Sequence, residues 1–420
     1  MKRGLLSRVR VLGLGVLLLA GGLLAGGPGR GLRDAEAASQ PIKIGLLYGI
    51  TGFAAIYTKP AIHGHELAQA EINAAGGVLG RPIQYVLRDD KSSPEVAVRM
   101  ANELLLREKV DFLTGTLASS VSLAVSEVAR KNKALFLVTI GKTEALTSDK
   151  GHRYAFRVAS NTLIEGRQFA ELEKGTPATR YYTIANDYEY GRKMIEAFVD
   201  HLKKVKPRAQ IVGQAWPKLG ETEYTPYITA IQAAKPDVVM NLVYGDMFIA
   251  FAKQAKPYGF FEKTRVITGA EVVSTEMAAP LGKDMPEGIL GNSYDLFYWP
   301  DTPEHKQFVK AYLDKTGESF VPGWAIQGYI GTYFLAEAIK KAGTTDTEKV
   351  IDALEGLTIK TPIGPITMRP YDHQANRGQV FGVTTHSADH PFAILKDVRY
   401  IPADGFWRDV EEIKALRGAK

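Results

Sequence analysis

The chain has 420 residues, a formal net charge of +6 and no Cys. Without thiols it forms neither disulfides nor Cys-ligated metal sites. Residues 1–37 carry about +4 of the charge and the remainder only about +2, so we do not expect nucleic acid as a partner.

The N-terminal residues show the three parts of an export signal. Residues 1–10 are basic, Val11 to Ala25 is almost wholly apolar, and Ala35-Glu36-Ala37 has the small-x-small pattern of a cleavage site. The apolar run is diluted by glycines and is shorter than the roughly 20 residues of a membrane-spanning helix. We therefore predict a signal peptide over residues 1–37 and a protein exported to the periplasm, rather than one held by a membrane anchor.

Apolar runs alternate with helical patterns through the first part of the remaining chain. Because the 383 residues that follow the predicted signal (420 minus 37) are too many for one core, two domains are expected. The predicted strands of the first domain cover residues 42–47, 82–87, 110–114 and 134–139. Its predicted helices cover 63–74, 96–107 and the stretch that runs from the end of the loop 115–120 through Lys131. Strands alternating with helices predict a parallel, doubly wound sheet.

The same pattern then starts again. The predicted strands cover residues 181–185, 209–214, 237–242 and 264–268, and the helices 190–201, 224–234 and 246–258. Residues Gly288 to Asp295 and the predicted helices 303–316 and 324–342 form no complete lobe, so we expect them to return to the first one.

The predicted fold is therefore α/β, with two doubly wound parallel-sheet lobes joined by a multi-strand hinge. Lobe 1 is assigned residues 38–160 plus 293–378, and lobe 2 residues 161–292 plus 379–420. No flexible Gly/Ser-rich or Pro-rich linker separates the halves, which favours several short crossings acting as a hinge.

A ligand of such a fold is expected outside the carboxyl ends of the strands, where helix N-termini present unpaired N–H groups. The loops at these ends carry hydroxyl, aromatic and acidic side chains. The candidate binding residues are Tyr57, Ser119, Ser120, Lys142 and Thr143 in the first lobe, and Tyr190, Tyr244 and Glu271 in the second. An α-amino acid would use both sets, since its carboxylate needs donors and its ammonium needs a carboxylate such as Glu271. The serines could equally be helix N-caps, and the tyrosines core residues.

Several segments resemble the type I periplasmic solute-binding proteins of the leucine/isoleucine/valine group, which serve ATP-driven importers. The resemblance covers nearly all of the chain after the signal. It is carried by Ile44-Gly45-Leu46-Leu47, Gly64-His65-Glu66-Leu67-Ala68, Glu71 to Gly80, Arg88-Asp89-Asp90, Gly115 with Ser119-Ser120, Asp187 to Gly191 and Tyr371-Asp372-His373-Gln374.

The resemblance implies a role for most of the candidate residues. Hydroxyls and amides matching Ser119, Ser120 and Thr143 would hold the carboxylate of a branched-chain or related amino acid, and Glu271 its ammonium. Tyrosines matching Tyr190 and Tyr244 would help to close the pocket. Lys142 departs from the family, which usually has a small residue there, and could face solvent or reach a second anion on the ligand.

The resemblance also implies the partners. The protein would capture its solute by lobe closure, act as a monomer, and deliver the solute to an ABC permease with its ATPase subunits. Neither a cofactor nor a metal is expected.

Two other classes of function are weighed against capture and delivery. For an enzyme, the sequence has no Gly-x-Ser-x-Gly elbow, phosphate-binding loop or His-Glu-x-x-His pair. His63 and His65 would lie on different faces of a helix, and Asp89-Asp90 fits turn chemistry better than a catalytic pair. The other alternative is a soluble ligand-sensing module of the same fold that acts on a receptor partner.

Overall fold

The computed structural model describes residues 40–418, and the residues from Gln40 onward form one compact unit. The predicted signal peptide lies outside the described residues. Within them, the helices are all too short or too polar to span a bilayer.

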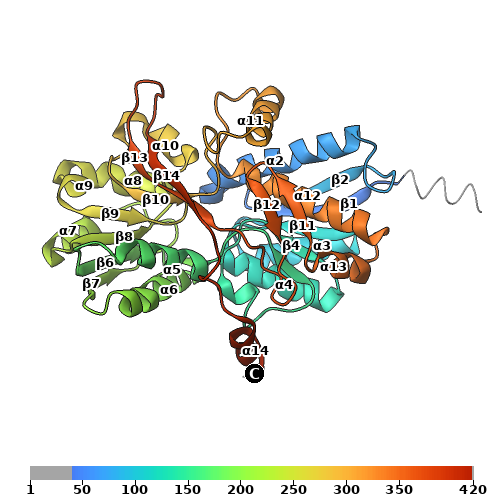
Figure 1. Cartoon of the computed structure of the whole chain (residues 1–420), viewed down its shortest axis with the longest axis horizontal. Coiled ribbons are helices and arrows are strands. Elements are labelled where there is room, and N and C mark those ends of the chain that lie inside the picture. Colours follow the sequence, from blue (N-terminus) through green and yellow to red (C-terminus); the bar gives the residue numbers. More distant parts are fainter. Residues whose placement is uncertain (1–39, 419–420) are drawn as a thin grey trace, which may run out of the picture. The chain divides into compact units, whose positions relative to one another are not determined.

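The first sheet has five strands in the order β2-β1-β3-β4-β5, and every neighbouring pair is parallel (Figure 1). Its strands are β1 (Ile42–Tyr48), β2 (Ile83–Asp89), β3 (Phe112–Gly115), β4 (Phe136–Val138) and β5 (Ala155–Arg157). Four of the five are predicted from their apolar runs. The prediction misses β5, whose three residues are too short a run to be distinguished from a loop.

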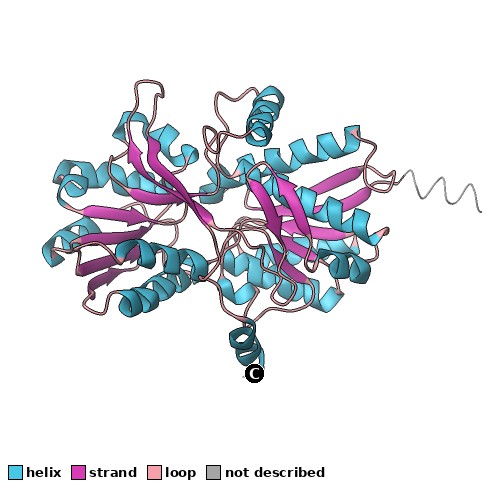
Figure 2. Cartoon of the chain, viewed as in Figure 1, coloured by secondary structure: helices cyan, strands magenta, loops and turns pink. Residues whose placement is uncertain are grey.

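Helices cover the first sheet (Figure 2). They are α2 (Ala55–Ala74), α3 (Pro94–Leu106), α4 (Ser119–Asn132), α11 (Pro303–Thr316), α12 (Ala325–Ala342) and α13 (Thr347–Leu354), with the short η1 (Gly52–Ala54) and η2 (Glu144–Leu146) and the hairpin β11 (Thr358–Thr361) and β12 (Gly364–Thr367). Helix α12 packs closely against α2. A Cβ at Gly64 would lie 1.9 Å from the carbonyl oxygen of Ala325, and one at Gly328 would lie 2.0 Å from that of Ala61. Glycine is therefore required at both positions of this helix contact.

The second sheet has seven strands in the order β14-β13-β10-β9-β8-β6-β7. They are β6 (Arg180–Ala185), β7 (Gln210–Ala215), β8 (Val238–Leu242), β9 (Arg265–Thr268), β10 (Leu290–Ser293), β13 (Gln379–Thr385) and β14 (Ile394–Ile401). β13 is antiparallel to both of its neighbours, β10 and β14, and the other neighbouring pairs are parallel.

Strand β10 corrects one expectation from the sequence. Leu290 and Gly291 pair with Ile267 and Thr268 of β9, so this strand belongs to the second sheet. The expectation that the segment from Gly288 to Asp295 returns to the first lobe is therefore wrong for the strand. The short apolar run gives no indication of its partner, which is decided by pairing with β9 and β13.

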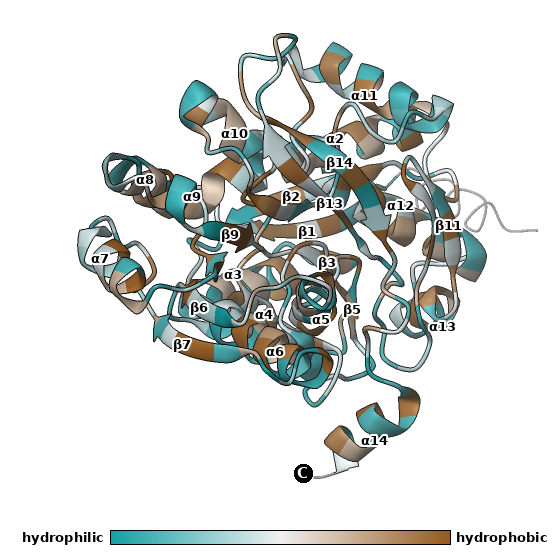
Figure 3. Ribbon diagram, turned by 60° about the vertical axis from the view of Figure 1, so that its left-hand side comes forward, coloured by the Kyte–Doolittle hydropathy of each residue, from teal (hydrophilic) through white to brown (hydrophobic). Residues whose placement is uncertain are grey.

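Helices also cover the second sheet, and α5 packs along α6. They are α5 (Thr162–Glu173), α6 (Glu189–Val205), α7 (Thr225–Ala234), α8 (Asp246–Ala255), α9 (Phe260–Lys263) and α10 (Thr275–Leu281), with the short η3 (Lys256–Tyr258) and η4 (Gly282–Asp284). The hydropathy of the residues follows this layering. In Figure 3, β1 is largely hydrophobic (brown), whereas outer helices such as α11 alternate between hydrophilic (teal) and hydrophobic residues.

The chain passes between the sheets after β5, after β10 and before β13. Two of these crossings run side by side, since Arg157 donates its backbone N–H to the carbonyl oxygen of His373 (2.9 Å) and accepts one from Ala375 (2.9 Å). The last helix, α14 (Val410–Gly418), follows β14, and its Arg417 donates to the carbonyl oxygen of Ser148 (3.0 Å). The predicted lobe boundaries and the hinge motion stay predictions.

Candidate functional site

A small cavity lies at the carboxyl ends of strands from both sheets. It is lined by Leu117 and Ser119 after β3, Ile140 and Lys142 after β4, Tyr188 and Tyr190 after β6, Tyr244 after β8, Ala270 and Glu271 after β9, and Trp324 before α12. Its volume is about 30 Å³. This is the edge at which open parallel sheets bind ligands, because the loops there are free to carry specific side chains.

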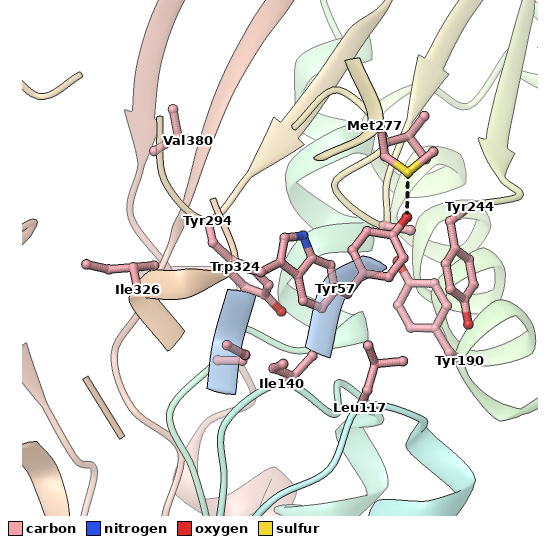
Figure 4. Close-up of a cluster of buried hydrophobic side chains, with 14 of the residues drawn as sticks. Tyr57, Leu117, Ile140, Tyr190, Tyr244, Met277, Tyr294, Trp324, Ile326 and Val380 are labelled. Atoms are coloured by element: carbon pink, nitrogen blue, oxygen red, sulfur yellow. Dashed lines mark hydrogen bonds between the residues drawn. The ribbon is translucent and has the colours of Figure 1, made fainter. Parts of the chain in front are cut away.

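Aromatic rings form much of the wall. Trp324 lies between Tyr57 and Tyr294 in Figure 4, with ring centroids 4.4 Å and 5.1 Å away. On the other side Tyr190 and Tyr244 meet edge to face at 6.2 Å. A solute at this place would therefore contact ring faces and edges over much of its surface.

The polar part of the site is a buried ion cluster. Lys142 is only 4% exposed, and its ammonium contacts Oε1 of Glu165, at 2.7 Å, and Oε1 of Glu271. Both glutamates are fully buried. Asn292 and Gln379 donate side-chain N–H groups to Glu271 Oε1 at 3.1 Å each, and Gln379 also donates to Glu165. The amides fix the carboxylates, so the cluster has a defined geometry.

Burial sets the protonation behaviour of the site. It raises the pKa of the Glu271 carboxyl, and the Lys142 ammonium opposes that rise. It also raises the pKa of the Tyr190 hydroxyl well above its ordinary value, and nearby Glu165 adds to this rise. Tyr190 is therefore a neutral hydroxyl at physiological pH, available as a hydrogen-bond donor.

Hydrogen bonds join the two lobes around the cavity. The Tyr57 hydroxyl accepts from the Gly245 N–H (2.7 Å) and donates to Met277 Sδ (3.0 Å). The Thr143 hydroxyl donates to Glu189 Oε1 (2.7 Å). These contacts connect segments that follow strands of the first sheet with segments that follow strands of the second.

Comparison with known proteins identifies the family. The sequence profile of the family described as "Periplasmic binding protein" matches residues 41–386, which is most of the chain. The chain belongs to the periplasmic binding protein family.

Individual relatives agree with this assignment. The chain is 26% identical to "Leu/Ile/Val-binding protein homolog 7" of Brucella suis, over 84% of this chain and 91% of that protein. Its fold is similar to that of an amino acid ABC transporter substrate-binding protein from Pseudomonas fluorescens, with 26% identity, a TM-score of 0.77, and 89% of this chain and 98% of that chain covered. It is also similar to a solute-binding protein of an ABC transporter from Rhodopseudomonas palustris, with 22% identity, a TM-score of 0.79, and 87% and 99% covered. The predicted type I fold is thereby confirmed.

The structure of this periplasmic binding protein brings together most of the residues predicted for the site. Five of them border the cavity: Ser119, Lys142, Tyr190, Tyr244 and Glu271. Thr143 and Tyr57 do not line it but contact residues that do, since the Thr143 N–H donates to Ser119 Oγ (3.1 Å) and the Tyr57 ring packs against Trp324 at a tilt of 34°. The part played by each in binding stays a prediction.

One predicted residue, Ser120, is placed differently from the expectation, and for Lys142 the structure excludes one of the two alternatives. Ser120 is half-buried on α4 and does not border the cavity, because the next residue along a helix points to a different side. Lys142 does not face solvent, because Glu165 and Glu271 of lobe 2 hold its ammonium in the interior.

The sequence does not reveal several residues of the site. Glu165 lies in the first turn of α5, away from any predicted strand end, and Trp324 immediately precedes α12. Only their tertiary contacts bring them to Lys142 and Tyr57. Tyr188 had a usable signal, since it lies beside Tyr190 in a loop that follows a predicted strand.

The weaker candidates have structural partners. Asp90 Oδ1 accepts the backbone N–H of Ser92 (2.7 Å), so the expected turn chemistry of the Asp pair is confirmed. His65 is buried, with Nδ1 2.9 Å from Thr332 Oγ1, whereas Nδ1 of His63 lies 3.4 Å from Glu318. The residues described include no group of three or more His, Cys, Asp or Glu side chains able to hold a metal ion.

Proposed function

We propose that the protein is the periplasmic solute-binding component of an ABC importer. It captures a small organic solute that carries a carboxylate, closes its lobes around it, and delivers it to a membrane permease driven by ATPase subunits. The observation that carries this proposal is the cavity itself, where side chains from both lobes meet at the carboxyl ends of their sheets.

Lobe closure is the mechanism, and no bond of the solute is made or broken. A solute that touches Ser119 and Lys142 on one lobe and Tyr190 on the other gains these contacts together only when the lobes meet. It therefore favours the closed arrangement by its differential affinity, and this arrangement is the one presented to the permease.

The polar groups support a carboxylate as the recognised group. Lys142, Ser119 and Tyr190 all border the cavity. Each is able to donate a hydrogen bond to an anionic oxygen, and those from charged donors are the stronger ones. The aromatic wall suits an apolar or aromatic remainder; the Rhodopseudomonas palustris protein of the same fold was crystallised in complex with 3,4-dihydroxy benzoic acid.

An amino acid of the branched-chain type is the second candidate solute. The name of the Brucella suis relative supports it. So does one structural feature, since Oε2 of Glu165 and of Glu271 accept no hydrogen bond among the described residues and could accept one from a ligand ammonium.

A thermal-shift screen tests the proposal with a panel of aromatic acids, aliphatic acids and amino acids. A solute at 100 times its dissociation constant adds about 2.7 kcal/mol to stability. We expect at least one carboxylate to stabilise the protein and to be recovered unchanged by mass spectrometry. If no carboxylate stabilises the protein, or if the solute is recovered altered, the proposal is wrong.

Uptake measurements separate an importer from the sensing module. Deletion of the gene should abolish uptake of the radiolabelled solute found in the screen. Normal uptake in the deletion strain would favour the sensor.

A further inference from the structure

The ammonium of Lys142 occupies a site built for a cation. It comes from lobe 1, in the loop between β4 and η2, and reaches two fully buried carboxylates of lobe 2, those of Glu165 and Glu271. It also lies 4.6 Å from the centroid of the Tyr294 ring. Two carboxylates and an aromatic ring are the surroundings that recognise an alkylammonium group.

The carboxylates are held ready for this cation by residues other than Lys142. Gln379 of β13 donates to both, and Asn292 of β10 donates to Glu271. All of these amide hydrogen bonds end on the same oxygen atoms that Lys142 contacts. The acidic pair is therefore positioned from within lobe 2, while its cation is supplied by lobe 1 across the cleft.

A second ammonium at this place would meet the charge of the first. The cavity beside the cluster, about 30 Å³, is bordered by Lys142 as well as by Glu271. An amino acid placed there brings an ammonium next to that of Lys142 in a buried setting, where like charges are poorly screened. A carboxylate without an amino group brings only the charge that Lys142 attracts.

We propose that Lys142 is a specificity-determining residue whose ammonium takes the place of a ligand ammonium, so that the site accepts carboxylates lacking an α-amino group and rejects amino acids. The part of this inference that concerns the ligand rests on the proposed function. It decides between the two candidate solutes, a carboxylate without an amino group and an amino acid. The occupied cation site itself is independent of any solute.

Chemical rescue tests the cation site directly. Lys142→Ala leaves the two carboxylates with a space the size of a small alkylammonium ion. We expect methylammonium chloride to raise the melting temperature of this variant by several degrees, while tetramethylammonium chloride, which has no N–H donor, leaves it unchanged. The wild-type protein should show no such response.

Lys206→Ala is the matched control, because the Lys206 ammonium contacts carbonyl oxygens of Glu173 and Thr176 instead of carboxylates. It should not be rescued. If Lys142→Ala is unfolded without methylammonium, the double variant with Glu165→Gln keeps one carboxylate and serves in its place. Absence of rescue in both, or equal rescue of Lys206→Ala, would overturn the inference.

Matched solutes test specificity. L-phenylalanine is compared with 3-phenylpropanoate, and L-leucine with 4-methylpentanoate, in the wild-type protein and in Lys142→Ala. In at least one pair, the substitution should raise the affinity for the amino acid relative to that for the matched carboxylate by at least tenfold. An unchanged preference, or no binding of either amino acid to the variant, would overturn the inference. The proposed function would still stand if another carboxylate stabilised the wild-type protein in the screen.

Discussion

The hydroxyl of Tyr57 joins segments that follow strands of the two sheets, and Tyr57→Phe removes its hydrogen bonds with Gly245 and Met277 while keeping the ring. In the structure this hydroxyl is buried and accepts the Gly245 N–H at 2.7 Å. Without it, the closed arrangement keeps a buried N–H with no partner, which costs about 1–3 kcal/mol. In an open arrangement water can reach the Gly245 N–H, so the cost applies to closure.

We expect a larger dissociation constant for the solute, with little change in the stability of either lobe. A cost of 1–3 kcal/mol corresponds to a loss of affinity of about 5- to 150-fold. Isothermal titration with the carboxylate found by thermal shift measures it. Tyr181→Phe is the control, because the Tyr181 hydroxyl donates to Glu173 (3.1 Å) within lobe 2. The reasoning is refuted if Tyr57→Phe binds as tightly as the wild-type protein, or if Tyr181→Phe weakens binding equally.

Two further substitutions test the structure around the site. Burial raises the pKa of Glu276 from 4.5 to about 7. Between pH 4.5 and pH 7 the folded protein therefore keeps a proton on this carboxyl that the unfolded chain has released. The free energy of unfolding should therefore fall by up to about 3 kcal/mol as the pH rises from 4.5 to 7. Urea unfolding at a series of pH values measures this loss, and Glu276→Gln should remove it. An equal dependence of stability on pH in the variant would contradict the assignment. Gly64→Ala should destabilise the protein by about 1–3 kcal/mol or more, because the new Cβ would lie 1.9 Å from the carbonyl oxygen of Ala325. Gly175→Ala, with open space around it, is the control, and equal midpoints would show that the helix contact yields easily.

The strands that the sequence predicts best are those buried on both faces. Residues 42–47 and 237–242 are mostly apolar, and they overlap the parallel strands β1 (Ile42–Tyr48) and β8 (Val238–Leu242). β5 has only three residues, and the edge strand β14 has mostly polar or partly exposed residues, so neither stands out by composition. Pairing partners are a tertiary property, which is why the placement of β10 was wrong.

The same division holds for the site. Ser119, Tyr190 and Glu271 follow predicted strands, and the geometry of parallel sheets brings such residues to one edge. Glu165 and Gln379 come from a helix and a distant strand, and nothing in their local sequence relates them to Lys142. The sequence could not decide whether Lys142 faces solvent or reaches an anion on the ligand. Its partners Glu165 and Glu271 are more than twenty residues away in the sequence, and only the fold places them beside it.

Lobe closure on a solute is the central claim, and a distance measured across the cleft tests it most directly. The chain has no Cys, so Lys59→Cys on α2 and Lys253→Cys on α8 place spin labels at two exposed positions without background. Electron paramagnetic resonance then gives the distribution of distances between the lobes. We expect the carboxylate found in the screen to shorten and narrow this distribution. Identical distributions with and without a saturating solute would contradict the account.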